Sequence, residues 1–333
     1  MNNNIKSHII GLGHHVPNRI INNDYFTQFM DTSDDWIKER TGIRERRWAK
    51  KNEGPSDIAI PAVEMALDNA HLTTNDIDFI IFSTSTPDYY IPGSGCLIQD
   101  KMNFKTIGAL DIRCQCSGFI YALSIADQYI KSGTYSNILV ITSEVQSTAM
   151  DLSNEGRDTA IIFADGAAAA VLSASNNDRG ILSTHLHTEG RHVKKLWVEA
   201  PSSKTQPRLS DTILQDRKHF LHMDGKEVFK HAVNRFPEVI IEGLKHNNLS
   251  SDDIDLLIPH QASGLAVKAY SKFGGFDESK VVNIINTTGN CVAASIPLAL
   301  ALAYEQKLFN RGDLLYFVGT GAGLSVASTL LRY

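Results

Sequence analysis

The sequence has no long apolar run, no cluster of basic residues and few cysteines. None of its apolar stretches reaches the ~18 residues that a membrane-spanning helix needs, so we expect no membrane span. Lys and Arg are scattered through the 333 residues and the formal net charge is −5, which argues against nucleic acid as a partner. The start, Met1 to Lys6, is polar and lacks the apolar segment of a signal peptide, so we expect a cytoplasmic protein.

The cysteines indicate free thiols and not a disulfide framework. There are only four, Cys96, Cys114, Cys116 and Cys291. The chain is long and 43% apolar, so it can bury a large core without disulfides, and a reducing compartment is the natural setting. Cys114 and Cys116 are one residue apart, which fits neither a redox C-x-x-C motif nor a zinc pattern.

The histidines do not form a recognisable metal motif. Of the 12 in the chain, His185, His187 and His192 come closest to metal-ligand spacing. They have no nearby cysteine and no clear fourth ligand. We therefore expect no metal.

Two distant stretches of the chain resemble each other. Residues 62–81 read AVEMALDNAHLTTNDIDFII, and residues 238–258 read EVIIEGLKHNNLSSDDIDLLI. Leu72 and Leu249 match at an offset of 177 positions, and residues 138–141 correspond to 314–317 at 176. A nearly constant offset of this length predicts a duplicated unit and not a solenoid repeat.

Each half has the pattern of an α/β unit. The spacing of Val63, Ala66 and Leu67 is helical, and residues 79–82 form a short continuous apolar run typical of a strand buried on both faces. Alternating helices and buried strands predict layers of helix and sheet. The polar run 173–180 is the best boundary, so we expect one half over residues 1–175 and a second over 176–333.

Cys116 is the candidate nucleophile. It follows a strand that ends near residues 110–112 and precedes an apolar helix predicted over 119–130. At a helix start, unpaired amides and the helix dipole favour a thiolate, so we expect a lowered thiol pKa. An inert buried cysteine is the alternative that the local sequence leaves open. Cys114 lies on the strand side, and we interpret it as a packing residue.

His260 and Asn290 occupy comparable positions in the second half. His260 follows the strand expected over 256–259, and its counterpart 177 positions earlier is Ser83, so the halves differ there. Asn290 lies between a strand expected over 281–285 and a helix beginning near Val292. It is 174 positions from Cys116, so both belong to strand-to-helix junctions that a pseudo-two-fold arrangement could bring to one cleft.

The motifs resemble those of β-ketoacyl-acyl-carrier-protein synthase III, within the thiolase-like condensing enzymes. The resemblance covers essentially the whole chain. It rests on DTSDDWIKERTGIRER (31–46), CSGF (116–119), FADGA (163–167), MDGKEVF (223–229), PHQA (259–262), GN (289–290) with AASIP (293–297), and the glycine-rich loop 319–323. It implies a thiolase fold, with two pseudo-symmetric halves in αβαβα layers.

The resemblance also implies an activity and a set of roles. An acyl group on Cys116 would undergo decarboxylative Claisen condensation with a malonyl thioester, whose enolate His260 and Asn290 stabilise. The amides of Cys116 and Ala322 would form an oxyanion hole. Trp36 and Arg157 resemble residues that stack on the adenine of coenzyme A, although ordinary packing explains Trp36 equally well. The expected partners are acyl-CoA, malonyl-CoA or malonyl-acyl carrier protein, and a second copy of the chain, with no resident cofactor.

The sequence departs from the family pattern beside the site. Ile91 and Thr320 stand where the family usually has Phe, so we expect a wider acyl pocket that accepts medium-length primers, with Ile91 reaching the partner subunit's pocket. Leu265 replaces a basic residue associated with carrier-protein docking. Two alternatives stay open: acyl transfer from Cys116 to an oxygen or nitrogen acceptor, and synthesis of an alkylquinolone- or pyrone-like secondary metabolite.

Overall fold

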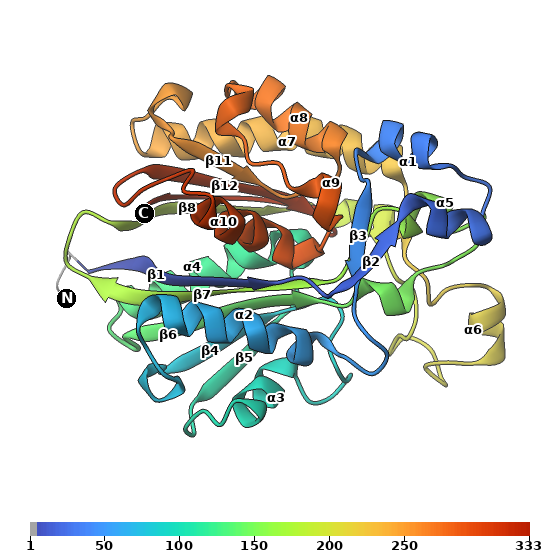
Figure 1. Ribbon diagram of the computed structural model, residues 1–333, viewed down its shortest axis with the longest axis horizontal. Helices are drawn as coiled ribbons and strands as arrows, with labels where there is room; N and C mark the ends of the chain where they lie inside the picture. The colour runs from blue at the N-terminus through green and yellow to red at the C-terminus, as the bar shows by residue number, and fades with distance from the viewer. Residues whose placement is uncertain (1–4) are drawn as a thin grey trace.

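The computed structural model describes residues 5–333. Residues 1–4, which contain most of the polar start that argues against a signal peptide, lie outside the described residues. The chain forms five layers in which two sheets alternate with three layers of helices (Figure 1). Among residues 5–333, no helix combines the length and the apolar character that crossing a bilayer requires.

The first sheet belongs to the N-terminal part of the chain. Its strand order is β1-β7-β6-β4-β5, with β4 parallel to both β5 and β6, and β7 antiparallel to both β6 and β1. The strands are β1 (Lys6–His15), β4 (Phe79–Ser83), β5 (Gly108–Ile112), β6 (Asn137–Glu144) and β7 (Gly166–Ser175). Every residue of β4 is buried, as its continuous apolar run predicts.

The second sheet repeats this arrangement in the C-terminal part without a counterpart of β5. Its order is β8-β13-β12-β11, with β11 parallel to β12 and the other pairs antiparallel. The strands are β8 (Gly180–Thr188), β11 (Leu256–Pro259), β12 (Leu314–Gly321) and β13 (Ser325–Arg332). The two pseudo-symmetric halves that the sequence predicts are therefore present, while the division at residue 175 stays a prediction.

The sheet register corrects the sequence alignment of the repeat. Phe79 pairs with Ile138 in the first sheet, and Leu256 pairs with Leu315 in the second. Each residue of the second pair lies 177 positions after its counterpart in the first pair. Ile138 therefore corresponds to Leu315 and not to Leu314. The strand expected over 281–285 is also wrong. Val281 makes only an isolated bridge to Leu257, and α9 (Ile285–Thr288) begins there.

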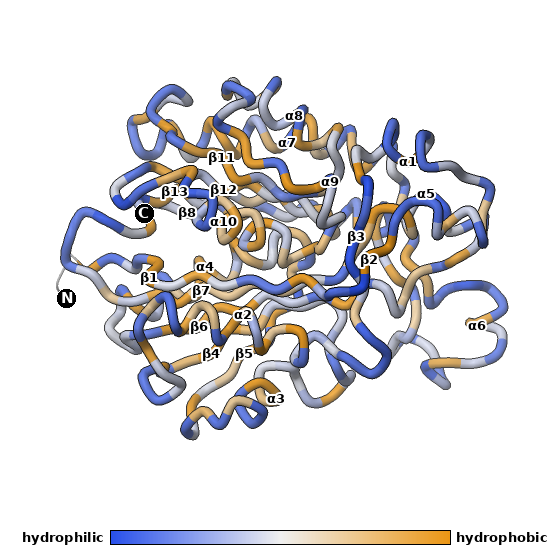
Figure 2. Tube along the Cα trace, viewed as in Figure 1, coloured by the Kyte–Doolittle hydropathy of each residue, from blue (hydrophilic) through white to orange (hydrophobic). Residues whose placement is uncertain are grey.

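Two helices fill the space between the sheets. These are α4 (Gly118–Lys131) and α10 (Ser295–Glu305), and both contact strands of each half. Helix α10 buries most of its residues because its apolar side chains lie all around its circumference, which suits a helix enclosed by sheets. In Figure 2 this helix and the neighbouring strands are largely hydrophobic, whereas the peripheral loops are hydrophilic.

The outer layers are amphipathic helices. Helices α2 (Pro55–Ala70) and α3 (Ser94–Lys101) cover the first sheet, and α7 (Gly225–His246) and α8 (Gly264–Gly274) cover the second (Figure 1). In α2, Val63, Ala66 and Leu67 face the core at helical spacing, as predicted.

The remaining elements gather mostly at one end of the layers (Figure 1). Those that carry Trp36, Asp158, Leu196 and Met223 contribute to the wall of the cavity described below. The full set is β2 (Arg19–Asn22), α1 (Asp34–Thr41), β3 (Glu45–Trp48), α5 (Arg157–Ala160), β9 (Leu196–Trp197), α6 (Asp211–Gln215) and β10 (His222–Met223).

Candidate active site

Cys116 lies at the junction between the first sheet and the central helix layer. It is in a short 3-10 helix, Gln115–Ser117, that runs directly into α4. Gln115 has φ of 44° and turns the chain out of the preceding segment. Val292, 177 positions later, has φ of 49° and makes the equivalent turn. The structural counterpart of Cys116 is therefore Ala293, and Asn290 lies three residues before it.

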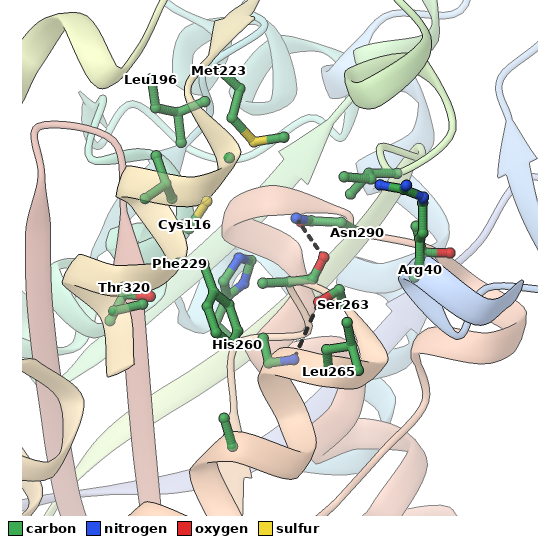
Figure 3. Close-up of a pocket in the computed structure, with 18 of the residues that line it drawn as sticks. Arg40, Cys116, Leu196, Met223, Phe229, His260, Ser263, Leu265, Asn290 and Thr320 are labelled. Atoms are coloured by element: carbon green, nitrogen blue, oxygen red, sulfur yellow. Dashed lines mark hydrogen bonds between the residues drawn. The ribbon is translucent and has the colours of Figure 1, made fainter. Parts of the chain in front are cut away.

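A cavity of about 450 Å³ brings the three predicted catalytic residues together. Cys116 comes from the first half, whereas His260 and Asn290 come from the second, and all three line the cavity (Figure 3). Its volume and largely apolar wall are those of a small-molecule site. Cys114 is half-buried and is not among the described residues that line it.

The expectation of a lowered thiol pKa is wrong. Cys116 is only 5% exposed. Burial, and to a smaller extent the nearby Glu144 carboxylate, raises the pKa of its thiol to about 12. Burial likewise raises the pKa of Glu144 to about 7, although that carboxyl accepts hydrogen bonds from Ser85 and Thr86. Desolvation thus outweighs the helix-start effect on which the sequence argument depended.

His260 is buried and oriented by Ser295. Its Nδ1 lies 2.6 Å from Ser295 Oγ, which also accepts a hydrogen bond from the Gln261 amide at 3.3 Å. Burial lowers the pKa of His260 to about 3, so the imidazole is neutral at physiological pH. Because Ser295 Oγ already accepts from the Gln261 amide, we assign its hydroxyl as the donor to Nδ1 and place the imidazole proton on Nε2. His260 can therefore donate from Nε2 into the cavity.

Asn290 is held through its carbonyl oxygen. Its Oδ1 accepts a hydrogen bond from the Val292 amide at 2.9 Å, while its Nδ2 makes one long contact, 3.4 Å, to Ala262 O. The fixed Oδ1 determines which end of the amide faces the cavity. Asn290 therefore presents N–H groups beside His260 (Figure 3).

Two backbone amides point at the thiol. The N–H groups of Cys116 and Ala322 lie close enough to the Cys116 sulfur to lower the pKa of the thiol, although less than burial raises it. The chain approaches closely here because Gly321 has no side chain: a Cβ on Gly321 would lie 3.0 Å from Cys116 Cβ. An oxygen on a carbon bound to Cys116 would lie in the same region, so the two amides form a candidate oxyanion hole.

Trp36 lies at the mouth of the cavity between two arginines. The guanidinium carbon of Arg40 is 4.4 Å from the ring centroid, and that of Arg157 is 4.5 Å away. Trp36 and Arg40 line the cavity, whereas Arg157 also donates to Asp31 O at 2.8 Å. The structure thus brings Trp36 and Arg157 together. A planar ligand ring can stack on Trp36 beneath Arg157 only if the Arg157 guanidinium moves away from the Trp36 ring.

The two predicted pocket residues differ in position. Thr320 lines the cavity near the end of β12. Ile91 is 79% exposed in the single chain and is outside the cavity lining, so its proposed contact with a partner subunit stays a prediction.

The histidines singled out from the sequence do not form one group. His185 and His187 both contact Glu242, at 3.2 and 2.6 Å. Within residues 5–333, the candidate metal ligands are instead Glu189, His192 and His231, with potential ligand atoms within 4.8 Å of one another. Arg235 Nε lies 2.5 Å from Glu189 Oε1, so a cation would have to displace an existing ion pair.

Comparison with known proteins identifies the family. The model of 3-oxoacyl-[acyl-carrier-protein] synthase III matches residues 110–190, and the model of its C-terminal part matches 244–333. The chain is 40% identical to the β-ketoacyl-[acyl-carrier-protein] synthase III of Clostridioides difficile over 330 residues, which cover 99% of both proteins. The chain belongs to the β-ketoacyl-[acyl-carrier-protein] synthase III family.

Solved structures agree with this assignment. The synthase III of Aquifex aeolicus VF5 is 38% identical with a TM-score of 0.89, and the match covers 98% of this chain and 100% of that one. The priming β-ketosynthase of the R1128 polyketide pathway is 30% identical with a TM-score of 0.89, over 98% and 96% of the two chains. The predicted thiolase fold is confirmed, and the chain is a condensing enzyme of the acyltransferase class.

Some synthase III site residues received no role from the sequence. Ser295 and Gln261 lie within motifs that carry the resemblance, but their link to His260 joins two segments 34 or 35 positions apart. Arg40 follows Trp36 by four positions in α1, which places both residues on one face of the helix. This spacing is a local signal from which the contact between Arg40 and Trp36 could have been predicted. Tyr270, which also lines the cavity, has no local signal.

Proposed function

We propose that this protein joins an acyl group carried on Cys116 to a malonyl thioester, with loss of carbon dioxide, to give a β-ketoacyl thioester. One observation carries the proposal. A buried thiol from one half and two neutral N–H donors from the other, on His260 and Asn290, face one cavity. Nucleophile and enolate-stabilising donors are the two parts that this reaction requires.

The first step transfers an acyl group from acyl-CoA to Cys116. The sulfur attacks the thioester carbonyl, and the oxyanion that forms is held by the amides of Cys116 and Ala322. The carbon–sulfur bond to coenzyme A then breaks, and the proton from the Cys116 thiol ends on the departing coenzyme A sulfur. Because burial raises the pKa of the Cys116 thiol to about 12, proton loss accompanies bond formation and does not precede it.

The second step uses His260 and Asn290. The malonyl thioester oxygen accepts hydrogen bonds from His260 Nε2 and Asn290 Nδ2, and both strengthen as the bond to the carboxylate breaks and an enolate forms. The enolate carbon attacks the acyl group on Cys116, and the Cys116 sulfur leaves and is reprotonated from solvent. Neutral donors suit this role, since a buried cation would bind the malonyl carboxylate itself. That contact would stabilise the substrate before carbon dioxide leaves and so slow decarboxylation.

The mouth of the cavity fits the adenine end of coenzyme A. Trp36 offers a ring face, and Arg40 and Arg157 offer cations for phosphate and for stacking. In this proposal the adenine takes the position of the Arg157 guanidinium on Trp36. The chemistry needs no resident cofactor, because the thioesters supply the acyl groups and decarboxylation supplies the carbanion.

The proposal includes the partners of the chain. Malonyl-acyl carrier protein or malonyl-CoA is the second substrate, as the names of the curated relatives suggest for a carrier protein. We also propose a homodimer in the cytoplasm, built from halves over residues 1–175 and 176–333. The consecutive side chains of Tyr89, Tyr90 and Ile91 are all exposed in the single chain, which suits a subunit contact.

The test is a two-stage assay. Intact-protein mass spectrometry after incubation with a series of acyl-CoAs measures acylation, and labelled carbon dioxide from malonyl-CoA measures condensation. We expect one acyl group per chain on Cys116 and carbon dioxide release that depends on it. Acylation followed by transfer to an alcohol or amine without carbon dioxide release would show simple acyl transfer and overturn the proposal.

A further inference from the structure

Thr320 lies near the end of β12, close to the segment that carries His260. The His260 amide donates to Val318 O at 2.8 Å, and Thr320 is the next but one residue along β12. Its neighbours Gly319 and Gly321 face Cys116, since a Cβ on either would lie within 3.4 Å of Cys116 atoms. Side chains alternate along a strand, so Thr320 faces the opposite layer, which is formed by α7 and α8.

The cavity extends between these two helices on the Thr320 side. Small residues, Ala232 on α7 and Ala266 and Ala269 on α8, line it there together with larger side chains of the same helices, among them Phe229 and Phe236. We call this part the α7–α8 arm. It adjoins His260, where the malonyl thioester oxygen binds in the proposed reaction.

Tyr270 closes the α7–α8 arm. Its ring is 1% exposed, and its centroid lies 4.3 Å from that of Phe236, which also lines the cavity. Its hydroxyl lies 3.3 Å from Thr320 Oγ1. Burial raises the pKa of Tyr270 to about 12, so the hydroxyl stays protonated. The Tyr270 ring, from α8, therefore lies next to Thr320, the position at which the family usually has a Phe ring.

We propose that Tyr270 determines how large a substituent the malonyl-type thioester can carry at its central carbon. This inference rests on the proposed function. With the thioester oxygen at His260 and Asn290, the central carbon faces the acyl group on Cys116, and a substituent on that carbon is directed toward the adjoining arm. The Tyr270 ring fills the end of the arm, so malonyl is accepted and methylmalonyl and ethylmalonyl are discriminated against. Each added methylene in a closed apolar pocket costs about 10-fold to 200-fold in specificity.

The experiment compares malonyl-CoA, methylmalonyl-CoA and ethylmalonyl-CoA with the acylated enzyme. Product formation is followed by mass spectrometry, and the result is the ratio of kcat/KM for each substituted substrate to that for malonyl-CoA. In Tyr270→Ala we expect the ethylmalonyl ratio to rise at least about 10-fold. In Tyr270→Phe, which keeps the ring and removes only the hydroxyl, we expect the ratio of the unmodified protein.

A second pair of variants guards against a folding defect. Tyr270→Leu keeps an apolar side chain in the core and should raise the ratio by a smaller factor. Adding Thr320→Phe to Tyr270→Ala returns a ring to the arm and should restore the original preference, a coupling expected only for residues that share one space. An unchanged ratio in folded Tyr270→Ala and Tyr270→Leu, or an equal shift in Tyr270→Phe, would overturn the inference. Carbon dioxide release from malonyl-CoA by the unmodified protein tests the proposed function separately.

Discussion

Ser295 Oγ lies 2.6 Å from Nδ1 of His260, and this contact directs the other imidazole nitrogen into the cavity. The two residues correspond to Gly118 and Ser83 of the first half, each 177 positions earlier. There a Cβ on Gly118 would lie 2.2 Å from Ser83 Oγ. The duplicated framework thus carries a histidine and its orienting hydroxyl in one half, and a glycine packed against a serine in the other.

Removing the Ser295 hydroxyl should slow condensation without preventing acylation. In Ser295→Ala the imidazole loses its Nδ1 donor, so the tautomer with a proton on Nε2 is no longer favoured. We expect carbon dioxide release to fall about 10-fold to 100-fold, from the loss of a buried hydrogen bond worth roughly 1–3 kcal/mol. Ser295→Thr should recover part of the rate, and Ser279→Ala, in an exposed 3-10 helix, is the control. Equal loss of acylation in Ser295→Ala would indicate a folding defect instead.

The choice of nucleophile can be tested with the two neighbouring cysteines. Cys116→Ala should abolish the acyl adduct seen by intact-protein mass spectrometry, because Cys116 lines the cavity between the two amides. Cys114→Ala should retain most labelling, since Cys114 is half-buried outside the cavity lining. Loss of labelling in folded Cys114→Ala, with labelling retained in Cys116→Ala, would reverse the assignment.

The Cys116 thiol should react slowly at neutral pH and faster at high pH. Burial raises the pKa of this thiol to about 12, so its thiolate fraction grows about tenfold per pH unit below that value. Alkylation of the Cys116 peptide by iodoacetamide should therefore rise about 100-fold between pH 7 and 9 without a plateau. A plateau near pH 7 would show that the helix start and the amides outweigh burial.

The exposed patch around Ile91 should hold two subunits together. Light scattering at micromolar concentration should give twice the chain mass. Ile91→Asp should weaken the dimer or the binding of acyl primers, because it places a charge where an apolar side chain, 79% exposed in the single chain, is expected to be covered. A monomeric unmodified protein with full activity would contradict this prediction.

The sequence predicts the fold correctly and picks out three residues, Cys116, His260 and Asn290, that the structure brings to one cavity, because these leave local signals. The apolar run of β4, the helix after Cys116 and the repeat offset can all be recognised from the amino-acid sequence. The thiol pKa of Cys116 could not be predicted, since its burial depends on β12 approaching from 200 positions away. Tyr270 was missed for the same reason: its neighbour Thr320 is 50 positions distant, and the sequence showed only that Thr320 is small.

In the proposed reaction Cys116 carries the acyl group, and the His260–Asn290 pair acts only on the malonyl thioester. The most direct measurement is acylation and carbon dioxide release on the same samples of His260→Ala and Asn290→Ala. Each variant removes one enolate donor, so we expect carbon dioxide release to fall about 100-fold to 1,000-fold while Cys116 is still acylated by acyl-CoA. If both folded variants fail to acylate Cys116, or if both release carbon dioxide at the unmodified rate, the proposed separation of roles between Cys116 and the His260–Asn290 pair is wrong.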